Sequence, residues 1–217
     1  MADTKISALS DGGAILATDQ VPVNRGGSNF RVTVGGGRIP QPRAITGHYY
    51  SLASGANALD EAGWNEILFV TPFFFSSAET WTRIGCSTGG FAAAKVRLGI
   101  YSSDSNGLPS ALLLDSGELD ASGSGDLEAT ISQALSANTL YWMAFITNSA
   151  DLVIKLCGWD PGVQAVVTFL LGHNGGCSNY VAGAISDTAT YGALPDPFPN
   201  VNFAGTSKRP LVWLRKV

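Results

Sequence analysis

The sequence from residue 45 onwards is built from short runs of β-forming residues that are separated by Gly, Ser, Asp and Pro. No long stretch repeats apolar residues with the 3.6-residue period of an amphipathic helix, and only residues 53–63 could form a short helix. Many short strands with intervening turns predict an all-β fold, a jelly-roll-like β-sandwich. The expected strands span residues 45–52, 66–75, 80–87, 95–101, 111–119, 126–132, 140–148, 152–158, 163–171 and 210–215.

The expected strands are of two kinds. In residues 95–101, apolar Val96, Leu98 and Ile100 alternate with charged residues, which predicts a strand with one face in solvent. Residues 67–70, 73–75, 140–146 and 166–171 are instead apolar on both faces. One sheet should therefore have its outer face covered, either by the same sheet of neighbouring subunits around a three-fold axis or by the chain's own long loops. The sequence leaves both covers open.

The chain of 217 residues is long enough for one domain with a sizeable core plus an appendage. Only 14% of the residues are charged, so part of the apolar surface is expected to be buried between subunits. The net charge of -4 and the absence of a Lys/Arg cluster predict no nucleic-acid partner. No stretch approaches the ~20 apolar residues that span a bilayer, which predicts no membrane insertion. The N-terminus lacks a secretory signal, which predicts synthesis in a cytosol.

Residues that could support catalysis or bind a metal are few. Cys86, Cys157 and Cys177 have no short paired spacing and are expected to be buried free thiols rather than zinc ligands. His48 and His173 lie in no Ser or Cys nucleophile motif. A cluster of acidic residues near the middle of the chain lies among Ser and Gly, which is typical of solvated turns rather than of a glycosidase pair. The sequence therefore predicts no enzyme, no metal site and no cofactor.

The first 36 residues differ in pattern from the rest of the chain. Residues 21–24 and 30–34 are two short β runs joined by a loop with two glycines, which predicts a β-hairpin. A lone two-stranded hairpin is marginally stable in water, so it should lean on the rest of the chain, on sister chains or on a docking partner. A triple glycine and two prolines follow, so we expect residues 37–42 to be a linker and residues 43–217 to be the sandwich domain.

The N-terminal residues also carry a motif. It consists of Lys-Ile-Ser-Ala-Leu at residues 5–9, an acidic-X-X-Pro-Val segment at residues 19–23 and a polar-Gly turn into a strand at residues 24–34. This motif resembles the N-terminal adaptor of fibre and spike proteins from tailed bacteriophages. The resemblance implies that residues 1–36 anchor the chain to other structural proteins of the virion. The anchoring residues that it implies are Lys5, Ile6, Leu9, Val21, Pro22, Val23, Phe30, Val32 and Val34.

A second resemblance concerns the sandwich domain. Residues 96–101, 106–110, 113–117 and 139–142 resemble a jelly-roll β-sandwich module that recurs in phage structural proteins and in extracellular bacterial proteins. That module is often an adhesive or carbohydrate-binding unit. Because the matching residues are fold residues, the resemblance supports the architecture rather than a particular ligand.

Three loops combine aromatic rings with amide, carboxylate or imidazole groups. This mixture suits a sugar, because an aromatic face stacks on the apolar side of the sugar ring while polar groups bind its hydroxyls. The residues that we expect to bind a glycan are Trp159, Asp160, His173, Asn174, Tyr180 and Tyr191. The competing interpretation is structural, since packing against the core is the commoner role of an isolated aromatic residue.

The resemblances imply a homotrimeric fibre on the head or the tail of a virion, made in the host cytoplasm and attached to a host surface polysaccharide. Multivalent display would then strengthen weak contacts with single sugars. The alternative is a structural capsid or tail decoration protein without a glycan site. A secreted adhesin without a virion fits less well, because the sequence lacks an export signal.

Overall fold

A computed structural model describes residues 20–25, 28–33, 44–51, 58–63, 65–157, 185–199 and 209–217. The chain forms two compact units that meet in sequence at residues 41 and 42. The described part of the first unit is an antiparallel hairpin of β1 (Gln20–Arg25) and β2 (Ser28–Thr33), which confirms the predicted hairpin. Both residues between the two strands are glycine, the residue type that tight hairpins favour. The predicted linker at residues 37–42 lies outside the described residues.

The predicted anchor residues fall partly within this hairpin. Val21, Pro22 and Val23 lie in β1, and Phe30 and Val32 lie in β2. The pairing sets Val21 opposite Val32 and Val23 opposite Phe30. Lys5, Ile6, Leu9 and Val34 lie outside the described residues. The anchoring role of all nine residues stays a prediction.

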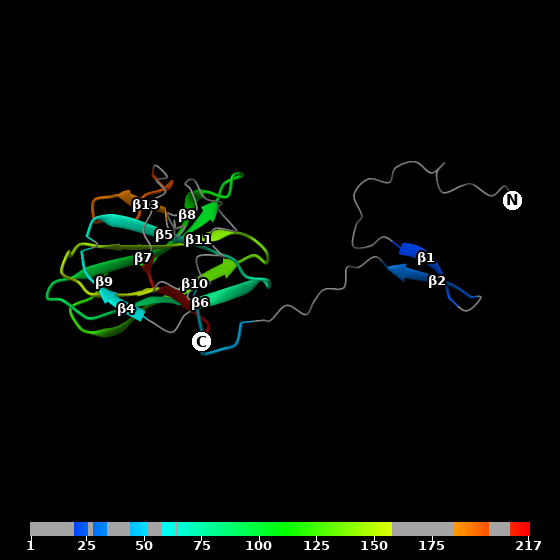
Figure 1. Cartoon of the computed structure of the whole chain (residues 1–217), viewed down its shortest axis with the longest axis horizontal. Helices are drawn as coiled ribbons and strands as arrows, with labels where there is room; N and C mark the ends of the chain where they lie inside the picture. Colours follow the sequence, from blue (N-terminus) through cyan, green and yellow to red (C-terminus); the bar gives the residue numbers. More distant parts are fainter. Residues whose placement is uncertain are drawn as a thin grey trace, which may run out of the picture. The chain divides into compact units, whose positions relative to one another are not determined.

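The second unit is a sandwich of two antiparallel sheets, drawn as two layers of arrows in Figure 1. One sheet contains β3 (Tyr49–Tyr50), β15 (Val212–Arg215), β6 (Glu79–Thr88) and β10 (Gly125–Leu135), extended by β12 (Ile154–Cys157), β4 (Ala58–Glu61) and β14 (Arg209–Pro210). The other contains β13 (Ile185–Thr188), β5 (Ile67–Phe73), β11 (Tyr141–Thr147), β7 (Lys95–Ser103) and β8 (Pro109–Asp115), with β9 (Leu119–Asp120) beside β7. The described residues contain no helix, so the predicted all-β sandwich is confirmed.

The strand order of the sandwich is that of a jelly roll. Four strands of one sheet lie in the order β3-β15-β6-β10, and four strands of the other lie in the order β5-β11-β7-β8. Among these eight strands, only β7 and β8 are neighbours both in the sequence and in a sheet. Every other connection crosses from one sheet to the other, which interleaves distant segments of the chain as in two packed Greek keys.

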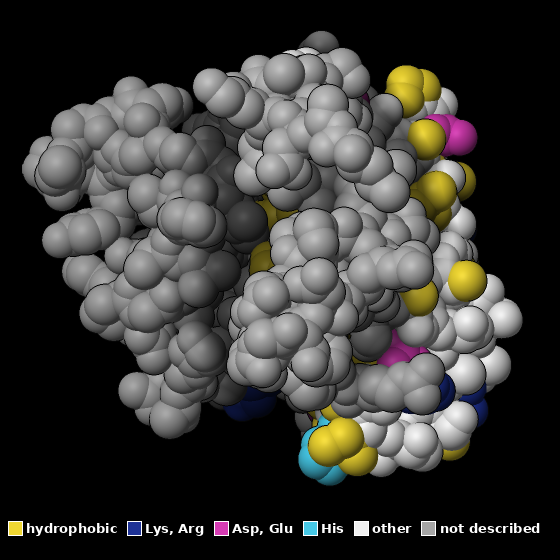
Figure 2. Space-filling view, turned by 90° about the vertical axis from the view of Figure 1, so that its right-hand side faces the viewer, with side chains coloured by type: hydrophobic (Ala, Val, Ile, Leu, Met, Phe, Trp, Pro, Cys, Tyr) yellow, Lys and Arg dark blue, Asp and Glu magenta, His cyan; other side chains and the backbone are white. Residues whose placement is uncertain are grey.

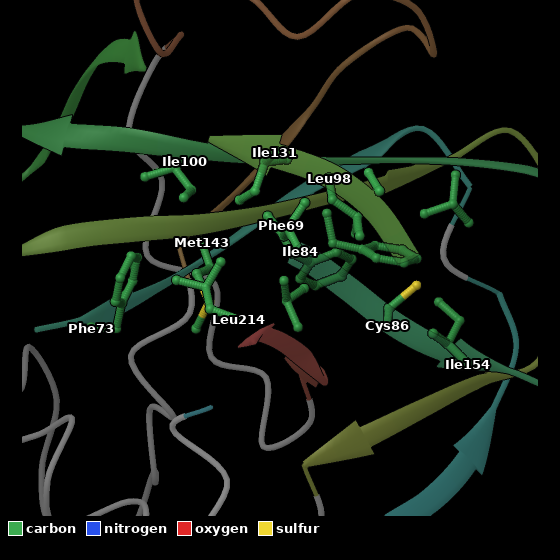
Figure 3. Close-up of a cluster of buried hydrophobic side chains, with 14 of the residues drawn as sticks. Phe69, Phe73, Ile84, Cys86, Leu98, Ile100, Ile131, Met143, Ile154 and Leu214 are labelled. Atoms are coloured by element: carbon green, nitrogen blue, oxygen red, sulfur yellow. The ribbon is translucent and has the colours of Figure 1, made fainter. Parts of the chain in front are cut away.

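The main core lies between the two sheets (Figure 3). Val96, Leu98 and Ile100 of β7 are fully buried in it, which confirms the core face predicted for this strand. The other face, predicted to lie in solvent, is instead buried at Gly99 and Tyr101. Figure 3 shows Leu98 and Ile100 facing Ile84 and Leu214, which belong to β6 and β15 of the opposite sheet. Side chains of the two layers therefore interdigitate, and most of the hydrophobic stabilisation of the fold arises here.

Cys86 is part of this core. Its side chain is fully buried and forms no disulfide, as the sequence predicted for the cysteines. Burial raises the pKa of the thiol to about 12, so the group stays protonated and unreactive at neutral pH. The side chains of Cys157 and Cys177 lie outside the described residues.

A second buried cluster lies on the outer face of the β5–β11 sheet. The sheet contributes Leu68, Val70, Tyr101, Trp142, Ala144 and Ile146. Residues 189–199, here called the strap, contribute Leu194 and Phe198. Of the two covers that the sequence left open for an apolar outer face, the structure therefore contains the second, a loop of the chain itself.

Hydrogen bonds attach the strap to β7 and β8. The Tyr101 hydroxyl donates to the Pro195 carbonyl oxygen at 2.9 Å, and the Phe198 N–H donates to the Ser110 carbonyl oxygen at 2.8 Å. The Asp196 carboxylate accepts a hydrogen bond from the Leu112 N–H at 3.0 Å. Because both polar and apolar contacts hold it, the strap is an integral layer of the fold rather than a loose loop.

Glycine is required where the strap comes closest to the sheet. A Cβ atom at Gly99 of β7 would lie 2.3 Å from Leu194 Cδ1 and 2.7 Å from the Leu114 carbonyl oxygen. Both distances are far below van der Waals contact, so any side chain at this position would push the strap or β8 away.

Individual segments depart in places from the sequence predictions. The short helix considered for residues 53–63 is wrong where it is described, because residues 58–61 form β4 and pair with β12. Pairing with a neighbouring strand here overrides a weak local helix preference. Residues 163–171, predicted as a strand, lie outside the described residues. The sequence reading missed β13, which pairs with β5 at the sheet edge.

The C-terminal strand is held at its end by polar contacts with β6. The Lys216 ammonium lies 2.7 Å from Glu79 Oε2, and the Val217 N–H donates to Thr82 Oγ1 at 2.8 Å. The Glu79 carboxylate is nearly buried, and the hydrogen bond from Lys216 lowers its pKa below the ordinary value of 4.5.

Gly99→Ala should destabilise the sandwich by about 1–3 kcal/mol, because the added methyl group overlaps Leu194 and the β8 backbone. Urea unfolding followed by circular dichroism measures this loss. Gly123→Ala is the matched control, since a Cβ atom there meets nothing within 4 Å. Equal stability of the two variants would contradict the close approach of the strap.

Acid should weaken the attachment of the C-terminal strand. A carboxylate with a lowered folded-state pKa stabilises the fold above its ordinary pKa of 4.5, and this contribution is lost as the pH falls through the lowered value. Glu79→Gln should therefore lower the free energy of unfolding by ~0.5–1 kcal/mol at neutral pH and make it less dependent on pH in the acid range. Urea unfolding between about pH 3 and pH 7 tests this. An unchanged acid slope in the variant would exclude Glu79 as its source.

Candidate functional site

Five of the six predicted glycan-binding residues lie outside the described residues, namely Trp159, Asp160, His173, Asn174 and Tyr180. The sixth, Tyr191, lies in the strap and is half-buried. Its ring packs against the second cluster, and its hydroxyl donates to Glu118 Oε2 at 3.4 Å. Burial and the charge of Glu118 raise the pKa of Tyr191 to about 12. These contacts are all within the chain, and ligand contact by Tyr191 stays a prediction.

An ion pair between β7 and β8 lies beside Tyr191, and its carboxylate also binds the strap. Arg97 Nη1 lies 2.8 Å from Asp115 Oδ2, and the same carboxylate oxygen accepts a hydrogen bond from the Leu194 N–H at 3.0 Å. Both side chains are largely shielded from solvent. The polar groups around Tyr191 therefore hold the strap in place, which is a structural role.

The opposite sheet has a different outer face, which carries an open groove of about 350 Å³. Its lining residues are Tyr49, Ser51, Ser87, Asp126, Lys155, Leu211 and Trp213. They come from β3, β6, β10, β12 and β15 or from the residues next to these strands. Side chains alternate between the two faces of a strand, and the neighbours Tyr50, Cys86, Leu127, Ile154 and Leu214 belong to the main core. The lining residues consequently share the outer face.

Trp213 forms the floor of this groove and is only 4% exposed. Its pairing partner across the sheet is Gly85 of β6. A Cβ atom at Gly85 would lie 2.3 Å from Cζ2 and Cη2 of the indole, so the ring lies directly on the β6 backbone. Glycine at this position thus allows a large aromatic ring to lie flat against the sheet.

Tyr49 stands at the edge of the groove and is 54% exposed. It meets Trp213 edge to face, with ring centres 4.6 Å apart and an interplanar angle of 88°. The guanidinium carbon of Arg215 lies 5.1 Å from the centre of the Tyr49 ring, within cation–π range. Arg215 is itself held by Glu128, with Nη2 at 2.6 Å from Oε2. These contacts orient the tyrosine ring while more than half of it stays accessible.

The groove combines an oriented aromatic ring and an apolar floor with several kinds of polar group. Asp126 provides a carboxylate, Lys155 an ammonium, and Ser51 and Ser87 provide hydroxyls. Such a set suits a small ligand with one apolar face and several hydroxyl groups. The sequence reading missed this site, because Tyr49 and Trp213 meet only through the pairing of β3 with β15.

Exposed apolar side chains elsewhere in the described chain are scattered. On the face drawn in Figure 2 they lie in separate places among polar side chains. The large ones, besides Tyr49, are Ile45, Phe74, Phe91, Leu113 and Val217. Single exposed apolar residues of this kind are ordinary on a protein surface.

Within the described ranges, no group of three or more His, Cys, Asp or Glu residues is placed to hold a metal ion. The same part of the chain has no helix that is long and apolar enough to cross a membrane. Comparison of the sequence with models of known protein families and with curated proteins finds no match to either. The N-terminal motif and the groove are therefore the observations that bear on function.

Proposed function

We propose that this protein is a bacteriophage virion fibre, on the tail or the head, that is displayed as a homotrimer and binds host surface glycans. Residues 1–36 attach it to other structural proteins of the virion, and the sandwich is the outward head. The observation that carries the proposal is the N-terminal motif, with Lys-Ile-Ser-Ala-Leu at residues 5–9 and the acidic-X-X-Pro-Val segment at residues 19–23.

The hairpin is suited to an anchoring role. It has only two strands, and an isolated hairpin of that size is marginally stable in water. Within the first unit, the outer edges of β1 and β2 pair with no further described strand. Such edges can add a strand from another protein, and backbone hydrogen bonds then supply much of the affinity. A virion protein that adds a strand to this small sheet would both stabilise the hairpin and attach the fibre to the particle.

The sandwich is suited to display. Its two sheets form one well-packed core, so residues on its outer faces keep fixed positions. A rigid head can present the same sugar site in each subunit of a trimer, and avidity then compensates for weak binding at each site. The low content of charged residues, 14%, supports the burial of surface between subunits.

A structural decoration protein without a glycan site is the second candidate. One specific observation favours it, because the ring of Tyr191 packs on the second cluster and its hydroxyl binds Glu118, a structural use of this residue. In that case the outer faces would contact sister subunits or the virion shell rather than a host.

Removal of residues 1–36 should abolish incorporation into virions, because it deletes the anchor and leaves the sandwich core complete. The measurement is the amount of protein in purified particles after expression of the full or truncated gene during infection. Circular dichroism and thermal unfolding of the truncated protein show whether the head still folds. Incorporation of a folded truncated protein at the normal level would refute the anchor.

The full-length protein should form trimers and bind bacterial surface glycans in a saturable manner. Light scattering coupled to gel filtration gives its mass in solution, and a glycan array gives its binding. A folded trimer that binds no glycan would favour the decoration protein. A folded monomer would remove the trimeric fibre from consideration.

A further inference from the structure

We propose that the groove beside Tyr49 is the saccharide-binding site of the head and that it takes an uncharged sugar ring. This inference rests on the proposed glycan-binding function and assigns it to residues that the loop-based prediction did not include. The ring stacks on Tyr49, above a floor made by Trp213 and Leu211. Asp126, Ser87 and Lys155 bind its hydroxyls.

Most of the site is built on strands, since Ser51 and Leu211 alone among its lining residues lie outside them. Ser87 and Asp126 face each other directly across the β6–β10 pair. The Leu211 N–H donates to the Lys155 carbonyl oxygen at 3.0 Å, which ties the β12 side of the groove to the β15 side. Groups that are fixed by sheet pairing lose little conformational freedom when a ligand binds, so even a small site can be selective.

Tyr49 has the features of a stacking platform. The residue is 54% exposed, and Trp213 and Arg215 contact its ring and restrict its orientation. An exposed tyrosine without such contacts would sample several rotamers and would lose that freedom on binding. In Tyr49 this rotamer freedom is already restricted in the folded protein, so the ring can stack on the apolar side of a sugar at little further cost in conformational entropy.

The lining surface is mostly apolar, and the charged groups among the lining residues indicate an uncharged ligand. One carboxylate, Asp126, and one ammonium, Lys155, lie in the lining, so their formal charges cancel. A carboxylate accepts hydrogen bonds, an ammonium donates them, and the hydroxyls of Ser51 and Ser87 can do both. Neighbouring hydroxyls of a neutral hexose can use this combination, whereas an acidic sugar would add a third charge to a lining whose formal charges already cancel.

The size of the groove limits the ligand to a short saccharide unit. Its volume of about 350 Å³ is at the lower end of the range for ligand sites, ~300–1,000 Å³. A single site of this size is expected to bind weakly, which agrees with a trimer that presents one such site in each subunit.

The test uses the full-length protein and a neutral glycan chosen as its best ligand on an array. Calorimetric titration of that glycan should show binding weakened about tenfold or more by Tyr49→Ala, because stacking is lost. Tyr49→Phe keeps the ring and should bind within about threefold of the unchanged protein. Asp126→Asn, which keeps the shape and removes the charge, should also weaken binding severalfold.

Tyr191→Ala tests the strap as the alternative site. Phe74→Ala is the matched control, since it removes an exposed aromatic side chain that does not line the groove. Both variants should leave glycan affinity unchanged if the groove is the site. Thermal unfolding of each variant identifies any loss of fold, and Asp126→Asn, a change of a single exposed side chain, keeps the test decisive if Tyr49→Ala unfolds.

The outcomes separate this inference from the function on which it rests. If the unchanged protein binds a glycan but neither Tyr49→Ala nor Asp126→Asn weakens that binding, the groove is excluded while the glycan-binding function stands. Loss of binding in Tyr191→Ala alone would place the site at the strap. Preference for acidic glycans would overturn the ligand class, and a folded protein that binds no glycan would overturn both proposals.

Discussion

The pairing of the C-terminal strand β15 with β6 is the contact on which the rest of the head depends. It places the last strand of the chain between β3 and β6, so that Leu214 enters the core and Trp213 lies over Gly85 on the outer face. The hydrogen bond between Val217 and Thr82 joins positions 135 residues apart in sequence. Closing so long a segment costs conformational entropy, which the buried contacts of both layers offset. Both the core and the groove therefore depend on contacts between segments that lie far apart in the sequence.

The two outer faces of the sandwich serve different purposes. On the β5–β11 sheet, the strap covers the apolar side chains, and its Leu194 N–H donates to Asp115, the ion-pair partner of Arg97. On the opposite sheet, aromatic and charged side chains stay partly accessible around the groove. On the first face the strap forms a third layer over the sheet. On the second face, aromatic and charged side chains stay accessible to a ligand. A head with this division can be stable and still present one binding surface, in agreement with the proposed fibre.

The fold could be predicted largely from local pattern, whereas the candidate site could not. The core-facing residues of β7 and the two-sided apolar run in β11 are properties of single strands, and both agree with the burial that the structure shows. The other face of β7, predicted to lie in solvent, is instead covered by the strap, which the pattern of that strand alone does not reveal. The cover over β11 was left open, because a buried face does not specify what buries it. The groove depends on Tyr49, Trp213 and Asp126, which are far apart in sequence and meet only through strand pairing. A search for aromatic residues in loops could not have found them, and of its own candidates only Tyr191 is described.

Gly85 and Gly99 have a consequence for the evolution of this protein. Each lies in the middle of a sheet, and each has a bulky side chain, Trp213 or Leu194, pressed against the position of its missing Cβ atom. Selection at both positions should therefore preserve the close packing of Trp213 and Leu194 on the backbone, and not a chemical function of the residue. Among diverging descendants of this chain, we expect both glycines to persist even where the side chains of the proposed saccharide site change. Invariance of these two glycines would then reflect packing between the layers, whereas variation in the groove residues would reflect differences in the ligand.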